Sequence, residues 1–122
     1  MRYGSHPLNL ALRFFLELTA WFAPGWWAWH RFGWWAGIIL GVALMAIWVV
    51  FAVRGDESRS GKTVVQTPGR IRLILEVCMF LFGVWTVRAS GYPDLAWILL
   101  AVVILHHLFS ADRLEWLWFW QP

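Results

Sequence analysis

Charged residues are scarce in this sequence, and their scarcity excludes an ordinary soluble fold. Only 14% of the 122 residues are Asp, Glu, Lys or Arg, while 61% are hydrophobic. In soluble domains the charged share is about a quarter. A water-soluble chain of this size could not bury so much apolar surface. The composition therefore predicts an integral membrane protein, which has the lipid bilayer as a partner.

Several groups that mark common functions are also missing. Cys78 is the only cysteine, so neither an intrachain disulfide nor a cysteine-based metal cluster can form. The segment Gly61-Lys62-Thr63 resembles the end of a phosphate-binding loop, but the first glycine of that motif would fall on Asp56. The sequence has no nucleophile beside a base and no basic stripe with interleaved aromatic residues. We therefore expect no enzymatic activity, no nucleic-acid partner and no bound metal.

Four apolar blocks make up most of the chain, and each is close to the length of about 20 residues that an α-helix needs to cross a bilayer. Alternation with a period of two, which is typical of strands, is absent from the first three blocks. The sequence therefore predicts an all-α fold, an integral membrane four-helix bundle that forms a single transmembrane domain over residues 1–122. The predicted spans cover about residues 8–29, 33–53, 70–88 and 94–111, followed by an interfacial aromatic tail at 112–122.

The basic residues predict the orientation of this bundle. With the N-terminus inside, the cytoplasmic side would hold most of them, as the positive-inside rule requires. Both termini and the polar loop between the second and third spans should then be cytoplasmic. The apolar run after Arg2 is interrupted by charges and lacks a cleavage site of small residues, so we expect this segment to be retained. The cytoplasmic set is Arg2, Arg13, Arg54, Arg59, Lys62, Arg70, Arg72 and Arg113, and the outer set is Arg31 and Arg88.

The charges within the spans form an internal repeat. The segment RFFLE at residues 13–17 returns as RLILE at 72–76, an offset of 59 residues. At the same offset Trp48 corresponds to His107, and several aliphatic residues also match. The repeat predicts two duplicated helical hairpins, related by a pseudo-twofold axis along the membrane normal.

These two segments also carry a family resemblance. Residues 9–18, NLALRFFLEL, together with RLILE at 72–76, resemble the YrdB-like family of small four-helix bacterial membrane proteins. The resemblance implies a multi-pass protein of the bacterial inner (cytoplasmic) membrane. It implies no activity, because the function of the family is not established. The sequence departs from the family in its tryptophan content and its aromatic tail.

Two further features predict contacts between helices or with partners. Gly33, Gly37 and Gly41 form a ladder of small residues that lets another helix approach closely. We favour packing within this chain over a homodimer seam. In the tail, the large apolar side chains cannot all lie on one face of a helix or strand, so some should meet lipid or another protein. The tail residues expected at such an interface are Trp116, Trp118 and Trp120.

Six ionisable residues are expected at one depth of the bundle. At a rise of 1.5 Å per residue, the two glutamates of the repeat fall near the bilayer centre, the arginines lie one turn nearer the cytoplasm, and two adjacent histidines of the fourth span reach the same layer. An ionisable group at this depth costs at least about 2.5–3.5 kcal/mol and faces protein or water. This predicted polar cluster consists of Arg13, Glu17, Arg72, Glu76, His106 and His107.

Two interpretations of the polar cluster remain open. Carboxylates and histidines in a row are typical of a proton or ion path. We prefer a structural role in which the charges neutralise one another, because each carboxylate has an arginine at i−4 and arginine does not give up its proton. The order Arg then Glu is the poorer one for a pair within a helix. We therefore expect cross-helix pairs, Arg13 with Glu76 and Arg72 with Glu17.

The two histidines should have different surroundings. His106 and His107 lie about 100° apart on a helix of 3.6 residues per turn, so at most one of them faces the bundle. We expect that histidine to hydrogen-bond Glu17 or Glu76. Ligation of haem or a chlorin through His106 or His107 is the alternative, although the sequence predicts no cofactor.

Three functions are compatible with the sequence, in order of preference. The first is a non-catalytic scaffold or accessory subunit of a membrane complex, with other membrane subunits or a second copy of the chain as its partner. The second is a proton-linked transporter or channel for a small solute, which would need a wet cavity at Glu17 or Glu76. The third is a membrane subunit that holds haem or a pigment.

Overall fold

The computed structural model describes residues 6–53 and 65–120, and it consists of helices with one short pair of strands. The all-α class expected from the sequence is confirmed, and the described residues form five helices where four were expected. The loop between the second and third helices, including Gly61-Lys62-Thr63, lies outside the described residues. The elements in chain order are α1 (Pro7–Phe32), α2 (Trp34–Val50), β1 (Phe51–Ala52), β2 (Val65–Gln66), α3 (Gly69–Ala89), α4 (Pro93–Phe109) and α5 (Ala111–Phe119).

The helix ends follow from local chemistry. Pro7 stands in the first turn of α1, where its missing N–H costs nothing. The side chain of His6 accepts a hydrogen bond from the Leu8 backbone N–H at 3.2 Å, which satisfies one of the free donors at this end. Between α1 and α2 stands Gly33, whose φ of 125° is a value that residues with a Cβ rarely adopt. A single glycine therefore turns the chain from one long helix into the next.

The end of α2 differs from the prediction. The second apolar block was expected to remain helical to Val53, but α2 ends at Val50 and Phe51–Ala52 form β1. This strand pairs in parallel with β2, with Phe51 opposite Val65 and Ala52 opposite Gln66. Periodicity cannot separate the last turn of a buried helix from a short buried strand, which is why the apolar block was assigned to one helix.

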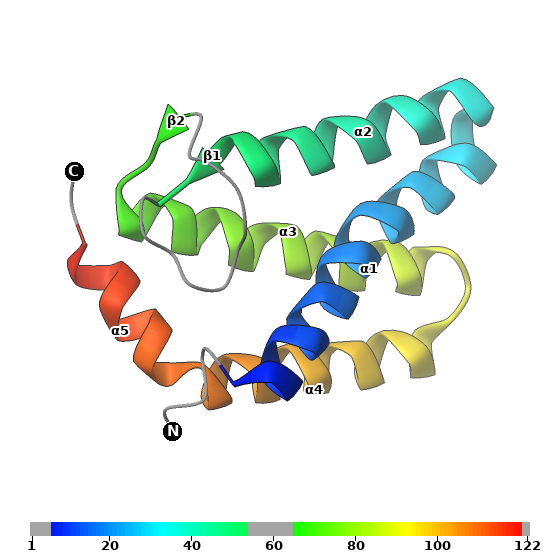
Figure 1. Cartoon of the computed structure of the whole chain (residues 1–122). Coiled ribbons are helices and arrows are strands. Elements are labelled where there is room, and N and C mark those ends of the chain that lie inside the picture. The colour runs from blue at the N-terminus through cyan, green and yellow to red at the C-terminus, as the bar shows by residue number, and fades with distance from the viewer. Residues whose placement is uncertain (1–5, 54–64, 121–122) are drawn as a thin grey trace.

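The helices are arranged as two hairpins and a terminal helix. Figure 1 shows the α1–α2 and α3–α4 connections at one end of the molecule and β1, β2 and α5 at the other. Helix α1 packs mainly against α2 and α3, and α3 packs against α4 and α5. The buried core draws on the four long helices and consists of Leu16, Ala20, Trp48, Met79, Phe80, Leu99 and Val103.

The glycine ladder lies against α1 in the same chain. A Cβ at Gly37 would lie 2.7 Å from both the Gly25 carbonyl oxygen and the Trp29 Cβ, so only glycine fits there. A Cβ at Gly41 would have ordinary contact with α1, 3.6 Å from the Trp21 carbonyl oxygen. Gly33 serves the turn instead of the packing. The face of α2 that carries Gly37 and Gly41 is thus occupied by α1.

The C-terminal segment, which was expected to be an interfacial aromatic tail, forms helix α5 and packs against the rest of the molecule. Helix α5 buries Arg113 and Leu117, which are four residues apart and so share one face. The Gly69 N–H donates to the Trp120 carbonyl at 3.1 Å, and Arg70 Nε donates to the Trp118 carbonyl at 2.9 Å. The sequence did not reveal this buried face, because only two residues form it and aromatic residues dominate the segment.

Membrane spanning was part of the prediction. In the part of the chain that the structure describes, no helix has both the length and the apolar character needed to cross a membrane.

Candidate functional site

The centre of the site is the carboxylate of Glu76 on α3, which has an exposed fraction of 0%. Arg13 of α1 donates to its Oε1 at 2.7 Å, and Arg72 of α3 donates to the same oxygen at 2.9 Å. Arg113 of α5 donates through Nη1 to Oε2 at 2.9 Å and through Nη2 to Oε1 at 2.6 Å. A carboxylate accepts about four hydrogen bonds. These four residues, named here the Glu76 cluster, therefore leave the carboxylate fully satisfied.

Arg72 also joins α3 to the end of α2. Its Nη1 donates to the carbonyl oxygens of Trp48 and Phe51, both at 2.5 Å. The last carbonyls of a helix have no partner within it, and a cation is favourable at that end. The guanidinium of Arg72 also lies 4.4 Å from the centroid of the Trp48 ring, within the range of a cation–π contact. Arg72 thus caps α2 while it neutralises Glu76.

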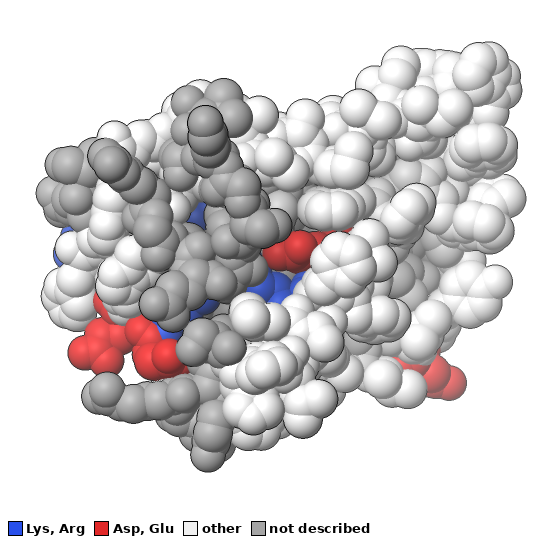
Figure 2. Space-filling view, viewed as in Figure 1, with Lys and Arg blue, Asp and Glu red and all other residues white. Residues whose placement is uncertain are grey.

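Glu17 on α1 has a different environment from Glu76. Its Oε1 lies 3.3 Å from Arg13 Nε, and its side chain keeps 14% exposure. The Trp48 side chain also hydrogen-bonds this carboxylate. Figure 2 shows acidic and basic atoms in a recess near the middle of the viewed face. The two glutamates that the repeat makes equivalent therefore differ in pairing and in exposure.

The expected pairings are half present. Arg13 contacts Glu76 across α1 and α3 at 2.7 Å, as predicted. The predicted pair of Arg72 with Glu17 is not formed, because the guanidinium of Arg72 is committed to Glu76 and to the carbonyls that end α2. The order of charges along each helix could not predict that Arg72 would also bind these carbonyl oxygens.

The two histidines have different hydrogen-bond partners, but both rings pack into the bundle, where at most one was expected, and neither bonds a glutamate. Buried His106 has its Nδ1 2.9 Å from Asn9 Oδ1, and Asn9 Nδ2 donates to Ser110 Oγ at 2.7 Å. His107 Nδ1 lies 2.8 Å from the Val103 carbonyl oxygen on the preceding turn. The expected hydrogen bond from a histidine to Glu17 or Glu76 was therefore wrong. Asn9, one turn before Arg13 on α1, forms the hydrogen bond with the His106 ring instead.

Three residues that hold the site together were not expected from the sequence. Arg113 was counted only as a cation of the inner interface, whereas Asn9 and Trp48 were given no polar role. The signal for Arg113 was its spacing of four from Leu117 after the helix break at Ser110. Nothing local to Asn9 or Trp48 reveals their partners, since these lie on other helices.

The described side chains offer little to a metal or a cofactor. Within residues 6–53 and 65–120, no group of three His, Cys, Asp or Glu side chains could hold a metal ion. His106 Nε2 and His107 Nε2 are buried and have no hydrogen-bond partner in this part of the chain. Neither nitrogen lines the two cavities described below. Haem or chlorin ligation thus gains no support from the geometry.

The chain belongs to the family described as "Protein of unknown function (DUF2568)", whose model matches residues 11–104. The matched stretch includes both Arg–Glu segments and ends before His106. The chain is also 38% identical over 113 residues to the "Uncharacterized protein YrdB" of Bacillus subtilis (strain 168), an alignment that covers 89% of this chain and 92% of that protein. The resemblance to YrdB-like proteins is thereby confirmed. No solved structure matches the chain.

Proposed function

We propose that the protein is a non-catalytic integral membrane protein that acts as a scaffold or accessory subunit of a membrane complex. In this account the Glu76 cluster is structural. The observation that carries it is the contact of one fully buried carboxylate with three guanidinium groups from α1, α3 and α5. A carboxylate held by three permanent cations is a poor carrier of protons, because protonation would remove the anion that the three guanidinium groups share.

The distribution of side chains supports a membrane location. Large apolar side chains cover the outside of the four long helices; Ile39 and Trp97, for example, are 61% and 64% exposed. Figure 2 shows a broad uncharged surface over α2 and the adjoining part of α1. Exposed apolar surface of this extent marks a lipid or protein contact. Helices α2 and α4 have 17 residues each, which is the lower end of the range of roughly 17–25 residues for a membrane span.

The proposed orientation puts the Glu76 cluster in the cytoplasmic half of a bacterial cytoplasmic membrane. Arg70, β1, β2 and α5 lie at one end of the molecule and the hairpin turns at the other (Figure 1). The positive-inside rule assigns the first end to the cytoplasm. Both termini are then cytoplasmic.

The contacts of Phe80 support an origin from two duplicated hairpins. Trp48 and His107, which the offset of 59 makes equivalent, both lie edge-on to the Phe80 ring, at centroid distances of 5.2 and 5.6 Å. The equivalent arginines also share a partner, since Arg13 and Arg72 both contact Glu76. In this account the two halves differ because Arg113 forms an ion pair with Glu76 of the second hairpin.

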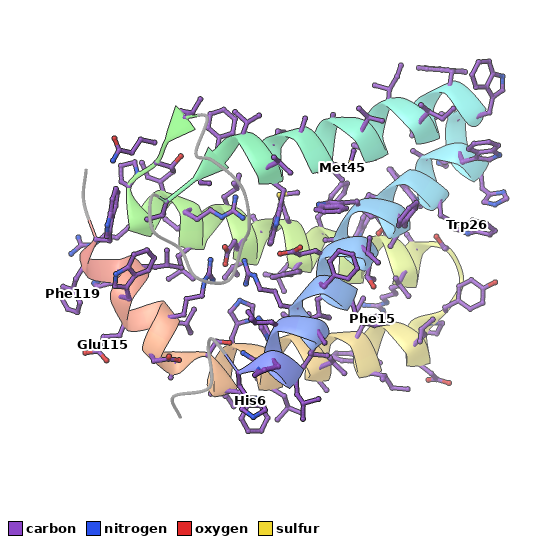
Figure 3. All side chains as sticks on the ribbon, viewed as in Figure 1. His6, Phe15, Trp26, Met45, Glu115 and Phe119 are labelled. Atoms are coloured by element: carbon purple, nitrogen blue, oxygen red, sulfur yellow. The ribbon has the colours of Figure 1, made fainter. Side chains whose placement is uncertain are left out.

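The exposed face of α5 is the proposed contact with another subunit or a second copy. Phe119 is 71% exposed, and Trp116 and Trp118 are also exposed at this cytoplasmic end. Figure 3 shows Phe119 pointing away from the helices. Because Leu117 and Arg113 fix the opposite face, the aromatic side chains are presented in a defined arrangement.

Two measurements test this proposal. First, the protein should stay in the membrane fraction after alkaline carbonate extraction. Second, affinity purification in mild detergent should recover a defined partner or a dimer, and Phe119→Ala with Trp116→Ala should release it without unfolding the helices. The control is Phe15→Ala, which removes a similarly exposed ring from the distant helix α1. Extraction of the wild type by carbonate would contradict the membrane location, and a monomer without partners would contradict the scaffold role.

A second candidate, proton-linked transport, is favoured by one observation. Glu17 has a single arginine contact and is partly exposed, so it retains the chemistry of a titratable group that Glu76 has lost. His106 Nε2, which is buried and has no hydrogen-bond partner among the described residues, would be the second member of such a path. Proton flux through liposomes that contain the purified protein separates the two candidates.

A further inference from the structure

A long apolar groove lies at the end of the molecule opposite the Glu76 cluster. It has a volume of about 880 Å³ and runs between α1 and α2 towards the α3–α4 connection. Phe22, Met45 and Leu95 line it, together with Gly25 and Gly41. The glycines bring the two helices into contact beside the groove, since a Cβ at Gly25 would lie 3.7 Å from Gly41 Cα. Figure 3 shows Met45 on α2 and Trp26 near the far end of α1.

The groove opens into a more polar cavity at the hairpin end. This second cavity has a volume of about 400 Å³ and is lined by residues that include Arg31. The two cavities are adjoining, because they share four lining residues: Trp26, His30, Ser90 and Tyr92. An apolar channel therefore ends at a mouth that contains a guanidinium, an imidazole, a hydroxyl and a phenol.

Neither Arg31 nor His30 forms an ion pair with another of the described residues. In the described residues, the Arg31 guanidinium makes only a ring contact, 5.9 Å from the Phe32 centroid. The His30 ring lies 4.3 Å from the Trp26 ring and likewise has no ion pair there. Trp21 also lines the groove, but its indole nitrogen is buried and not accessible from it. The mouth of the site therefore has a guanidinium that the described residues do not pair with an anion.

We propose that this site binds one phospholipid with an anionic head group. The phosphate would accept hydrogen bonds from Arg31 and His30, since a guanidinium recognises phosphate oxygens in a bidentate manner. The acyl chain would lie in the groove beside the contact of α1 with α2. Trp26 and Tyr92 are residue types that prefer the head-group level of a bilayer.

The charge at the mouth and the shape of the groove select this occupant. A free phosphate would leave the apolar groove empty, and a neutral lipid would leave Arg31 without a counter-ion. The inference rests on the proposed membrane location but concerns a site at the opposite end from the Glu76 cluster. The test is therefore preceded by carbonate extraction, so that failure of lipid binding and failure of membrane insertion give different results.

The experiment uses the full chain in mild detergent and native mass spectrometry. Phosphatidylglycerol and diacylglycerol, which lacks the phosphate, are compared with identical acyl chains. We expect wild type to retain the anionic lipid about tenfold better, the value of one lost charge-assisted hydrogen bond. Arg31→Gln should abolish the preference. Arg88→Gln is the matched control, because Arg88 lies in the last turn of α3 at the same end but lines neither cavity.

A second variant tests the groove itself. Val42→Trp enlarges an exposed side chain that lines the groove and should reduce retention of both lipids. Arg31→Gln should leave retention of diacylglycerol unchanged, whereas an unfolded variant would lose both lipids. Equal retention of both lipids by wild type, or the same loss from Arg88→Gln as from Arg31→Gln, would overturn the inference. Displacement of the lipid by millimolar inorganic phosphate, or a dimer that Val42→Trp dissociates, would also overturn it.

Discussion

Arg113 and Glu76 form a two-pronged contact, in which Arg113 Nη1 lies 2.9 Å from Glu76 Oε2 and Arg113 Nη2 lies 2.6 Å from Glu76 Oε1. The residues are 37 positions apart in sequence and belong to α5 and α3. A planar guanidinium matched to a carboxylate fixes direction as well as charge. The contact therefore makes α5 part of the buried core of the site.

Removing the shared carboxylate should strongly destabilise the protein. Glu76→Gln keeps the shape of the side chain but leaves three guanidiniums without their anion. Breaking a buried pair in this way costs about 3–5 kcal/mol. The measurement is the free energy of unfolding in mild detergent, and the control is Glu115→Gln on the exposed face of α5, which should change it by less than about 0.5 kcal/mol. Equal effects from the two variants would contradict a central role for Glu76.

Arg13 and Glu76 should be energetically coupled. In a double-mutant cycle, Arg13→Leu and Glu76→Leu should couple by an amount on the order of 1 kcal/mol or more, because each single change strands a buried charge. The same cycle with Arg13→Leu and Glu115→Leu supplies the comparison, since Glu115 is exposed on another helix. Strictly additive losses for Arg13 and Glu76 would mean that their 2.7 Å contact contributes nothing.

Docking of α5 should depend on the absence of a side chain at Gly69. A Cβ there would overlap the Leu117 carbonyl oxygen, so Gly69→Ala should displace α5 at a cost of about 1–3 kcal/mol. Amide hydrogen exchange over residues 111–119 should accelerate while exchange in α1 stays slow. Gly41→Ala is the control, because its nearest neighbour would be 3.6 Å away. Unchanged exchange in Gly69→Ala would show that α5 has room to adjust.

The orientation can be read with reporter fusions. Fusions at Ser60 and at the C-terminus should both report a cytoplasmic location, because the basic residues favour that side. A fusion at Gly91, in the α3–α4 turn, should report the outer side. An outer signal at Ser60 or at the C-terminus would overturn the proposed topology.

The positions of the helices could be predicted closely, because the apolar blocks are long and are separated by turn-forming and polar residues. The third block was expected over residues 70–88, and α3 runs from Gly69 to Ala89. The charged repeat also identified Arg13, Arg72 and Glu76 as members of one cluster. These features are local in the chain, so they can be recognised from the sequence alone.

The remaining contacts could not be predicted because they depend on where chains meet. Arg72 leaves Glu17 for the carbonyl oxygens of Trp48 and Phe51, and these become available only where α2 ends. Arg113 reaches Glu76 only because Gly69 lets α5 lie against the start of α3. Both are consequences of tertiary packing, and no spacing within a single helix contains them.

The most direct test of the structural role of the Glu76 cluster is proton flux through liposomes that contain the purified protein. With an imposed pH gradient, a pH-sensitive dye inside the liposomes should show no more flux than in protein-free liposomes. Glu17→Gln and Glu76→Gln should leave that baseline unchanged, even though Glu76→Gln weakens the fold. Flux through the wild type that disappears with Glu17→Gln, while Glu115→Gln retains it, would contradict the account and assign Glu17 to a proton path.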